Sequence, residues 1–256
     1  TLEHPDPVTS LFAIDNRVIT VAINHTAKVW NLTTGVLENT LRQGGHIFSL
    51  FALGNRVITG SDDHTAKVWN LTTGVLEHTL QHDDEVLSVF AIGNRVITGS
   101  TGHDAKVWDL TTGELEQTLQ HSGGHTEGDG LLFALGNRVI TVSRGIAKVW
   151  NLETRELENE LTDSVYSVFA IGNHVITGSG DNTAKVWNLT TGALEHTLEH
   201  TEPVWSVFAI GRHVITGSRL AKVWRLPKFN IKLETRINSK ILKRNPNNTR
   251  KRSNQW

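Results

Sequence analysis

The sequence contains no cysteine and no methionine, and it has only five prolines and one tyrosine. Without cysteine, disulfide bonds and thiolate metal sites are excluded. Because a complete reading frame begins with methionine, we expect the chain to be a fragment or a processed product. No apolar run approaches the roughly 18 residues of a membrane-spanning helix, and the first residues, TLEHPDPVTS, show no signal-peptide pattern. Its 38% hydrophobic and 20% charged residues indicate a soluble, globular chain.

Charge is distributed unevenly along the chain. Residues 227–256 hold nine Lys or Arg and one Glu, a net charge of +8, which leaves sixteen basic and twenty-five acidic residues, net −9, in the rest. Residues 236–256 are basic, rich in Asn and without a core pattern, so we expect a disordered tail there. We favour a solvated linker over a nucleic-acid-binding or nuclear-targeting segment, because the tail has one aromatic residue, Trp256.

One tetrapeptide, Ala-Lys-Val-Trp, occurs six times. The six copies end at Trp30, Trp69, Trp108, Trp150, Trp187 and Trp224. They are 39, 39, 42, 37 and 37 residues apart, and a period near 40 indicates stacked structural units.

Each unit shows short, mostly β-branched apolar runs separated by turn residues. In the third unit the predicted strands are residues 86–90, 95–98, 105–108 and 114–119. Gly93-Asn94 is a hairpin signal, since both residues tolerate positive φ. The sequence therefore predicts an all-β protein of six four-stranded antiparallel sheets. Arranged radially, such sheets bury each other's faces.

The unit resembles the WD-repeat (tryptophan–aspartate) β-propeller family over residues 1 to about 226. The eponymous dipeptide is present once, at Trp108-Asp109; Asn follows the other tryptophans, except for Arg225 after Trp224. Residues 228–235 alternate apolar and polar side chains, so we expect them to form the outer strand of the sixth blade and the propeller domain to span residues 1–235. Thr1-Leu2-Glu3-His4 repeats residues 197–200, so these residues either close a six-bladed ring or follow further blades of a seven-bladed or larger propeller.

The resemblance also implies a buried network in each blade, made of the Trp, a Ser or Thr, an Asp and a His. Thr fills the hydroxyl position in all six units, whereas Asp occurs at two positions and His at three, and Gln43 and Leu161 are interpreted as replacements of the His. We assign structural roles to the six tryptophans and to Thr59, Asp63, His82, Thr177, Asp181 and His200.

Metal binding and catalysis are the two chemical alternatives. His78 with His82, and His196 with His200, are four residues apart, but they recur in register, so we assign them structural or surface roles. An insertion places His121, His125, Glu127 and Asp129 together; displaced loop residues are the favoured interpretation over a metal site. Ser, His and Asp recur as structural residues do, and no unique nucleophile with a base is evident. We predict no metal, no cofactor and no enzymatic activity.

One column on the first strand varies while its neighbours stay almost constant. Its residues are Thr9, Phe48, Leu87, Gly130, Tyr166 and Trp205. In the family that the chain resembles, this strand lines the central channel and the column opens on the partner-binding face. We therefore predict that Thr9, Phe48, Leu87, Tyr166 and Trp205 form a partner-binding channel rim; packing between blades is the alternative.

Together these features predict a non-enzymatic, intracellular scaffold, cytoplasmic or nuclear, that binds protein or peptide partners and neither membranes nor nucleic acid. The alternative is a sensor or adaptor module from a larger multidomain signalling protein whose other domain carries the activity.

Overall fold

The computed structural model describes residues 2–102, 104–121, 131–143, 145–162 and 164–226, and these residues form 23 strands and no helix. Consecutive strands pair antiparallel into six sheets, five with four strands and the last with three. We call these sheets blades 1 to 6 in chain order. The predicted all-β architecture of repeated antiparallel sheets is confirmed.

The strand bounds follow the repeat closely. Blade 1 contains β1 (Val8–Ile14), β2 (Arg17–Ala22), β3 (Thr26–Asn31) and β4 (Leu37–Arg42). Blade 2 contains β5 (Ile47–Leu53), β6 (Arg56–Ser61), β7 (Thr65–Asn70) and β8 (Leu76–Gln81). Blade 3 contains β9 (Val86–Ile92), β10 (Arg95–Ser100), β11 (Ala105–Asp109) and β12 (Leu115–Leu119).

The second half of the chain continues the pattern. Blade 4 contains β13 (Leu131–Leu135), β14 (Arg138–Ser143), β15 (Ile146–Asn151) and β16 (Leu157–Thr162). Blade 5 contains β17 (Val165–Ile171), β18 (His174–Ser179), β19 (Thr183–Asn188) and β20 (Leu194–Glu199). Blade 6 contains β21 (Ser206–Ile210), β22 (His213–Gly217) and β23 (Ala221–Arg225).

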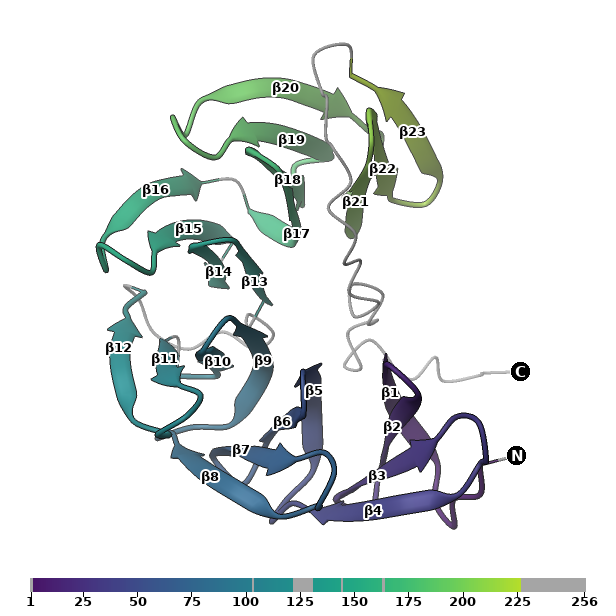
Figure 1. Cartoon of the computed structure of the whole chain (residues 1–256). Helices are drawn as coiled ribbons and strands as arrows, with labels where there is room; N and C mark the ends of the chain where they lie inside the picture. Colours follow the sequence, from purple (N-terminus) through teal and green to yellow (C-terminus); the bar gives the residue numbers. More distant parts are fainter. Residues whose placement is uncertain (1, 103, 122–130, 144, 163, 227–256) are drawn as a thin grey trace, which may run out of the picture.

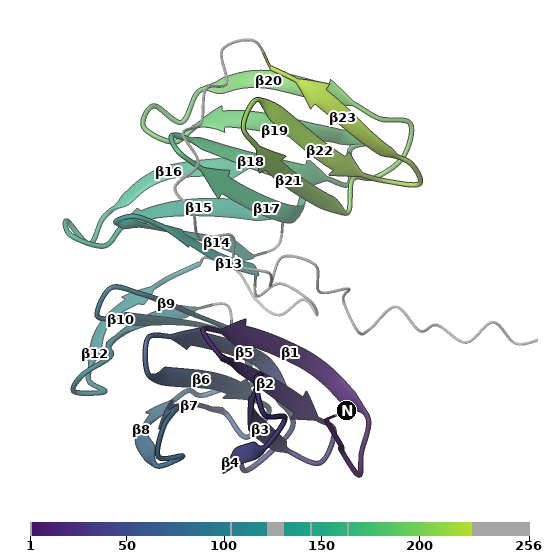
Figure 2. The same ribbon diagram turned by 45° about the vertical axis from the view of Figure 1, so that its right-hand side comes forward.

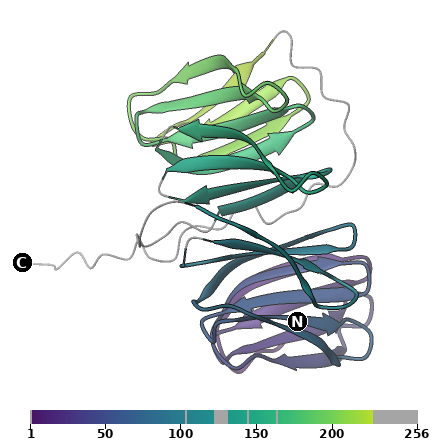
Figure 3. The same cartoon turned by 90° about the vertical axis from the view of Figure 1, so that its left-hand side faces the viewer.

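The blades are arranged radially around a common centre, with the first strand of each blade innermost (Figure 1). Each blade is therefore a propeller blade, and its sheet packs face to face on the next sheet along the chain. Figure 3 shows the closed side, where the teal strands of blades 3 and 4 lie next to each other.

The second strand is almost entirely buried in blades 1 to 5, whereas β22 of blade 6 alternates between buried and more exposed residues. In blade 3 the second strand buries Val96, Ile97 and Thr98 in succession. In blade 2 the close approach to blade 3 also requires glycine on this strand, whereas blades 1 and 4 carry Val21 and Val142 at this position. A Cβ added to Gly60 would lie 2.9 Å from Cγ1 of Val86 in the next blade, so a side chain here would force the blades apart.

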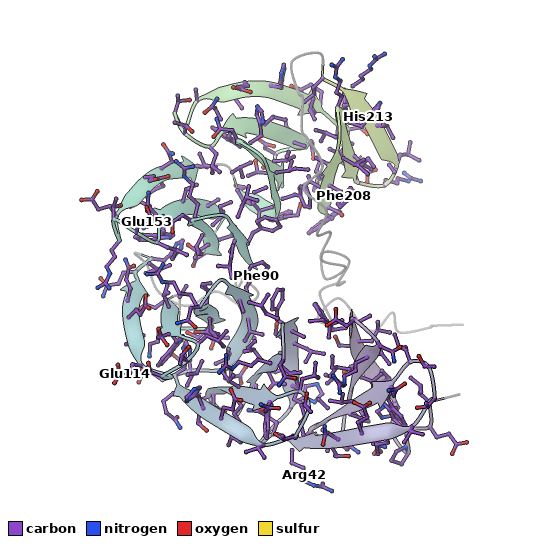
Figure 4. The ribbon with its side chains drawn as sticks, viewed as in Figure 1. Arg42, Phe90, Glu114, Glu153, Phe208 and His213 are labelled. Carbon is purple, nitrogen blue, oxygen red and sulfur yellow. The ribbon has the colours of Figure 1, made fainter. Side chains whose placement is uncertain are left out.

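A row of phenylalanines, one from the first strand of each blade, runs through all six blades. The residues in order are Phe12, Phe51, Phe90, Phe133, Phe169 and Phe208. Successive ring centroids are 5.4, 4.5, 6.3, 5.5 and 4.8 Å apart, within the range of favourable aromatic contacts. Figure 4 shows Phe90 and Phe208 near the centre of the arc.

The blades form an open arc. Figures 1 and 2 show blade 1, in purple, and blade 6, in yellow-green, separated on the open side. The described residues Leu2, Glu3 and His4 belong to no strand, so closure of a six-bladed ring by these residues is not observed. Blade 6 has three strands in the described part of the chain, not the four expected. The predicted outer strand at 228–235 and the basic tail at 236–256 lie outside the described residues.

The phenylalanine row provides a test of inter-blade packing. Phe51 is buried and contacts Phe12 and Phe90. Substituting Phe51→Ala removes both contacts and leaves a cavity, which should reduce the free energy of unfolding by about 3–5 kcal/mol in urea titrations. Leu76→Ala, at an exposed position in the same blade, is the control and should change it by less than about 1 kcal/mol. Equal effects of the two substitutions would contradict the proposed role of the row.

Candidate interaction surface

The predicted structural tryptophans each donate a hydrogen bond to the threonine on the second strand of the same blade. The indole Nε1 to Thr Oγ1 distances lie between 2.8 and 2.9 Å in all six blades. The threonines are Thr20, Thr59, Thr98, Thr141, Thr177 and Thr216. This bond satisfies an indole N–H that would otherwise be costly to bury.

Blade 2 has the most extended version of the network, although it has Gln43 in place of histidine. Thr59 donates to Oε1 of Gln43 at 2.7 Å, and Nε2 of Gln43 donates to Asp63 at 3.2 Å. The amide therefore provides both an acceptor and a donor, as a neutral imidazole would. Partial burial of Asp63 opposes ionisation, but hydrogen bonds from Thr65 and Gln43 and the ammonium of Lys67 lower the pKa of its carboxyl overall.

Histidine completes the network in other blades. Nε2 of His82 is 2.7 Å from Oγ1 of Thr98, and Nε2 of His200 is 2.7 Å from Oγ1 of Thr216. Burial, followed by the charge of Lys106, lowers the pKa of His82 to about 4. His82 is thus held neutral by its surroundings and engaged with a buried hydroxyl, which suits a structural role.

The structure adds to this network one residue that the sequence had not assigned to it. His121, which lies in the insertion, is hydrogen-bonded to Oγ1 of Thr141 and so occupies the histidine position of blade 4. The interpretation of Leu161 as a replacement of the histidine was wrong, because Leu161 is buried and pairs with Ala147 as Leu41 pairs with Ala27. The insertion before β13 had obscured the register of His121, and the shorter connection before β17 had obscured that of Leu161.

The fold also explains His78, another histidine of the metal-like pairs. His78 reaches the next blade, where its Nε2 lies 2.9 Å from the carbonyl oxygen of Thr111. In the part of the chain that the structure describes, no group of three or more His, Asp or Glu side chains is placed to hold a metal ion. His125, Glu127 and Asp129 lie outside that part.

The variable column coincides with a β-bulge at the start of the innermost strand. In blade 5, Val165 pairs with Ser179 and Ser167 with Gly178, so Tyr166 has no partner on β18. The same register shift occurs at Thr9, Phe48 and Leu87 in blades 1, 2 and 3. A bulge residue lies outside the regular ladder, and its side chain is redirected. This geometry explains why the column varies between otherwise similar strands.

Tyr166 and Trp205 form an exposed aromatic stack across two neighbouring blades. Their ring centroids are 4.7 Å apart and their planes differ by 15°. Tyr166 is 44% exposed and Trp205 is 59% exposed. The ring of Tyr166 lies close to Gly180, where an added Cβ would be only 2.6 Å from the tyrosine Oη. Glycine at this turn therefore allows the tyrosine to lie against the backbone.

The other predicted rim residues are not gathered around this stack. Phe48 in blade 2 is half-buried, with its ring centroid 5.4 Å from that of His46. Leu87 in blade 3 is half-buried, and Thr9 in blade 1 donates a hydrogen bond to the carbonyl of Val21. Gly130 is outside the described residues. Of the five predicted positions, the structure thus brings Tyr166 and Trp205 together.

Comparisons with known proteins agree with this architecture. The family model described as "WD domain, G-beta repeat" matches residues 35–70 and 154–188. A search of curated proteins found no significant match. Among solved structures, the chain is similar to the computationally designed Ika8 protein, with 27% identity and a TM-score of 0.77 over 89% of this chain and 74% of that chain. The fold is thus that of a β-propeller, and two segments of the chain match the WD-repeat family model, which supports a WD-repeat family.

The described residues contain no helix long and apolar enough to cross a membrane.

The lowered pKa of His82 leads to a pH-dependence test. Since the folded-state pKa is about 4 and the unfolded value is about 6.5, the unfolded state binds more protons between these values. The contribution of His82 is therefore complete above pH 6.5 and is lost as the pH falls toward 4, by about 2 kcal/mol between pH 8 and pH 5. His82→Gln, which places in blade 3 the amide that Gln43 supplies in blade 2, should flatten the decline in unfolding free energy over this interval by that amount.

Burial also lowers the pKa of His4 and His200, so the slope should decrease in His82→Gln without vanishing. His213→Gln, at an exposed position on the outer part of blade 6 (Figure 4), is the matched control and should retain the wild-type slope. An unchanged slope in His82→Gln, measured by urea unfolding at pH 8 and pH 5, would refute the assignment.

Proposed function

We propose that the protein is a non-enzymatic interaction scaffold that binds a protein or peptide partner at the channel rim. The observation that carries this proposal is the exposed stack of Tyr166 on Trp205. WD-repeat propellers in general serve as protein-interaction scaffolds, which supports the general class of function. The stack specifies where on this chain the contact would be made.

The physical chemistry of the stack favours binding. Tyr and Trp are enriched at the centres of protein interfaces because they provide large contact areas at low conformational cost. Here stacking restricts the motion of both rings, and the ring of Tyr166 also lies close to the backbone at Gly180. A partner that covers the rings would therefore displace water from a preorganised apolar surface, with little entropy lost by the scaffold.

Additional polar groups lie at the same end of blade 6. Glu202, in the loop before β21, is 3.6 Å from Arg219 in the turn after β22, and both are exposed to solvent. Exposed ion pairs of this kind contribute little to stability. They can instead orient a partner around the aromatic contact, as polar rims do in protein interfaces.

The test combines Tyr166→Ala with Trp205→Ala. Both side chains are exposed, so the double variant should lose no more than about 2 kcal/mol of unfolding free energy, chiefly the aromatic contact itself. Binding of a genuine rim partner should weaken at least tenfold, since buried Tyr and Trp anchors commonly contribute about 2 kcal/mol or more.

The matched control is Leu115→Ala combined with Leu194→Ala, two exposed apolar residues on outer strands away from the rim. Affinity capture should be run with the wild type and both double variants, and titrations with each purified candidate should follow. A rim partner is retained by the control and lost by the rim variant. Loss of most thermal stability in the rim variant would instead indicate that the two aromatics belong to the core.

A further inference from the structure

Arg219 is a cationic residue in a part of the fold that is otherwise acidic. We call the rim end of a blade the end formed by the connection into its first strand and by the turn between its second and third strands. These two segments lie together because paired strands run in opposite directions; in blade 5, the N–H of Gly180 donates to the carbonyl oxygen of Ser164 at 3.2 Å. Among the described residues of these segments, Arg219 is the only Lys or Arg, whereas carboxylates are frequent, as at Asp62 and Asp83.

The lysines nearest to the rim end are held against the blades and differ from Arg219 in exposure. The side chains of Lys67, Lys106 and Lys185 on the third strands are each 16% exposed, and each is paired with an aspartate, at 3.5, 3.8 and 2.8 Å. The side chain of Arg219 is 81% exposed, and its ion pair with Glu202 at 3.6 Å joins two accessible groups. A pair of this kind contributes little to stability, so a ligand can engage the guanidinium at little cost to the fold.

Arg219 also lies beside the stack of Tyr166 on Trp205. The N–H of Trp205 donates to the carbonyl oxygen of Gly217 at 2.9 Å, so the backbones of Trp205 and Arg219 lie within about 10 Å of each other. An extended peptide advances about 3.3 Å per residue. A side chain on the stack and another at Arg219 are therefore separated by about three residues or fewer, and one short segment can contact both.

The position of the tyrosine ring depends on Gly180. A Cβ added there would lie 2.6 Å from the tyrosine Oη, although the φ of Gly180 is not positive. An alanine would therefore fit the backbone and collide with the ring. The counterparts of Gly180 in blades 1, 2 and 3 are Ile23, Asp62 and Thr101, all of which carry a Cβ. Gly180 is thus a positioning residue that lets Tyr166 lie over the turn and reach Trp205.

We propose that this rim site takes a short peptide segment with one apolar side chain on the Tyr166–Trp205 stack and one carboxylate, within about three residues of it, on Arg219. This assignment rests on the rim contact proposed above and adds the chemistry of the partner. Guanidinium groups bind carboxylates through two parallel N–H donors. The carboxylates elsewhere at the rim end repel further acidic groups, so a single acidic residue fits better than an acidic run.

The experiment selects peptides from a random 12-residue phage library on the full chain. The double variant Tyr166→Ala, Trp205→Ala is used to remove phage that bind elsewhere. We expect the enriched peptides to carry an apolar side chain with Asp or Glu within about three residues. Arg219→Glu should weaken binding of synthetic copies of these peptides about tenfold or more. A new selection on that variant should favour Lys or Arg at the position that was acidic.

Arg42→Glu is the matched control for the change in charge. Arg42 is exposed at the end of β4 in blade 1 and points away from the arc (Figure 4). At physiological salt its charge is screened from blades 5 and 6, so this variant should bind the same peptides within about twofold of the wild type. Equal weakening by Arg42→Glu and Arg219→Glu would contradict a direct contact with Arg219.

Two further variants change the site without removing a ring or the guanidinium. Glu202→Gln removes the carboxylate that competes for Arg219 and should strengthen binding of the acidic peptides about twofold. Gly180→Ala should displace Tyr166 and weaken binding about fivefold, while the melting temperature stays the same or rises slightly because the unfolded chain loses freedom. Gly102→Ala is its control in blade 3, where the added Cβ would meet Oδ2 of Asp84 instead, and it should bind as the wild type does.

The outcomes separate this assignment from the rim contact itself. Peptides that require Tyr166 and Trp205 but show no acidic preference, or that bind Arg219→Glu as tightly as the wild type, would overturn the carboxylate assignment and leave the rim contact standing. A selection in which no peptide depends on Tyr166 and Trp205 would overturn both.

Discussion

Packing between blades is the interaction on which the rest of this structure depends. A four-stranded sheet with two apolar faces cannot bury both of them alone, so each blade requires a neighbour on either side. This requirement explains the almost completely buried second strands of blades 1 to 5, the glycine at position 60 where two blades approach closely, and the row of phenylalanines through the centre. It also explains why the two end blades differ from the inner four although their sequences are nearly the same.

Hydrogen bonding within the blades is less uniform than the packing between them. The pair formed by the tryptophan indole and the threonine hydroxyl is present in every blade, whereas the third and fourth members of the network vary. Gln43 can replace histidine because its amide also offers one acceptor and one donor. The network therefore tolerates substitution wherever the new side chain satisfies the buried hydroxyl.

The residues that repeat from blade to blade stabilise the fold, whereas the position that varies is available for recognition. The bulge releases one residue of the innermost strand from the ladder, so that residue is not required to match its neighbours. In blade 5 the bulge residue is Tyr166, which stacks on Trp205 of blade 6, and both rings remain accessible. A difference between copies at one position thus generates a local surface on an otherwise regular scaffold.

Much of the local structure was determined by the sequence alone. The four strands predicted in the third unit correspond to β9, β10, β11 and β12, and Gly93 has the positive φ expected in its hairpin, because strand periodicity and turn preferences act over a few residues. Tertiary structure decided the place of His121 in the network, since an insertion hides the register. It also decided which rim residues meet and the curvature of the arc. Both depend on small rotations between packed blades, which accumulate over five interfaces and leave no local signal in the chain.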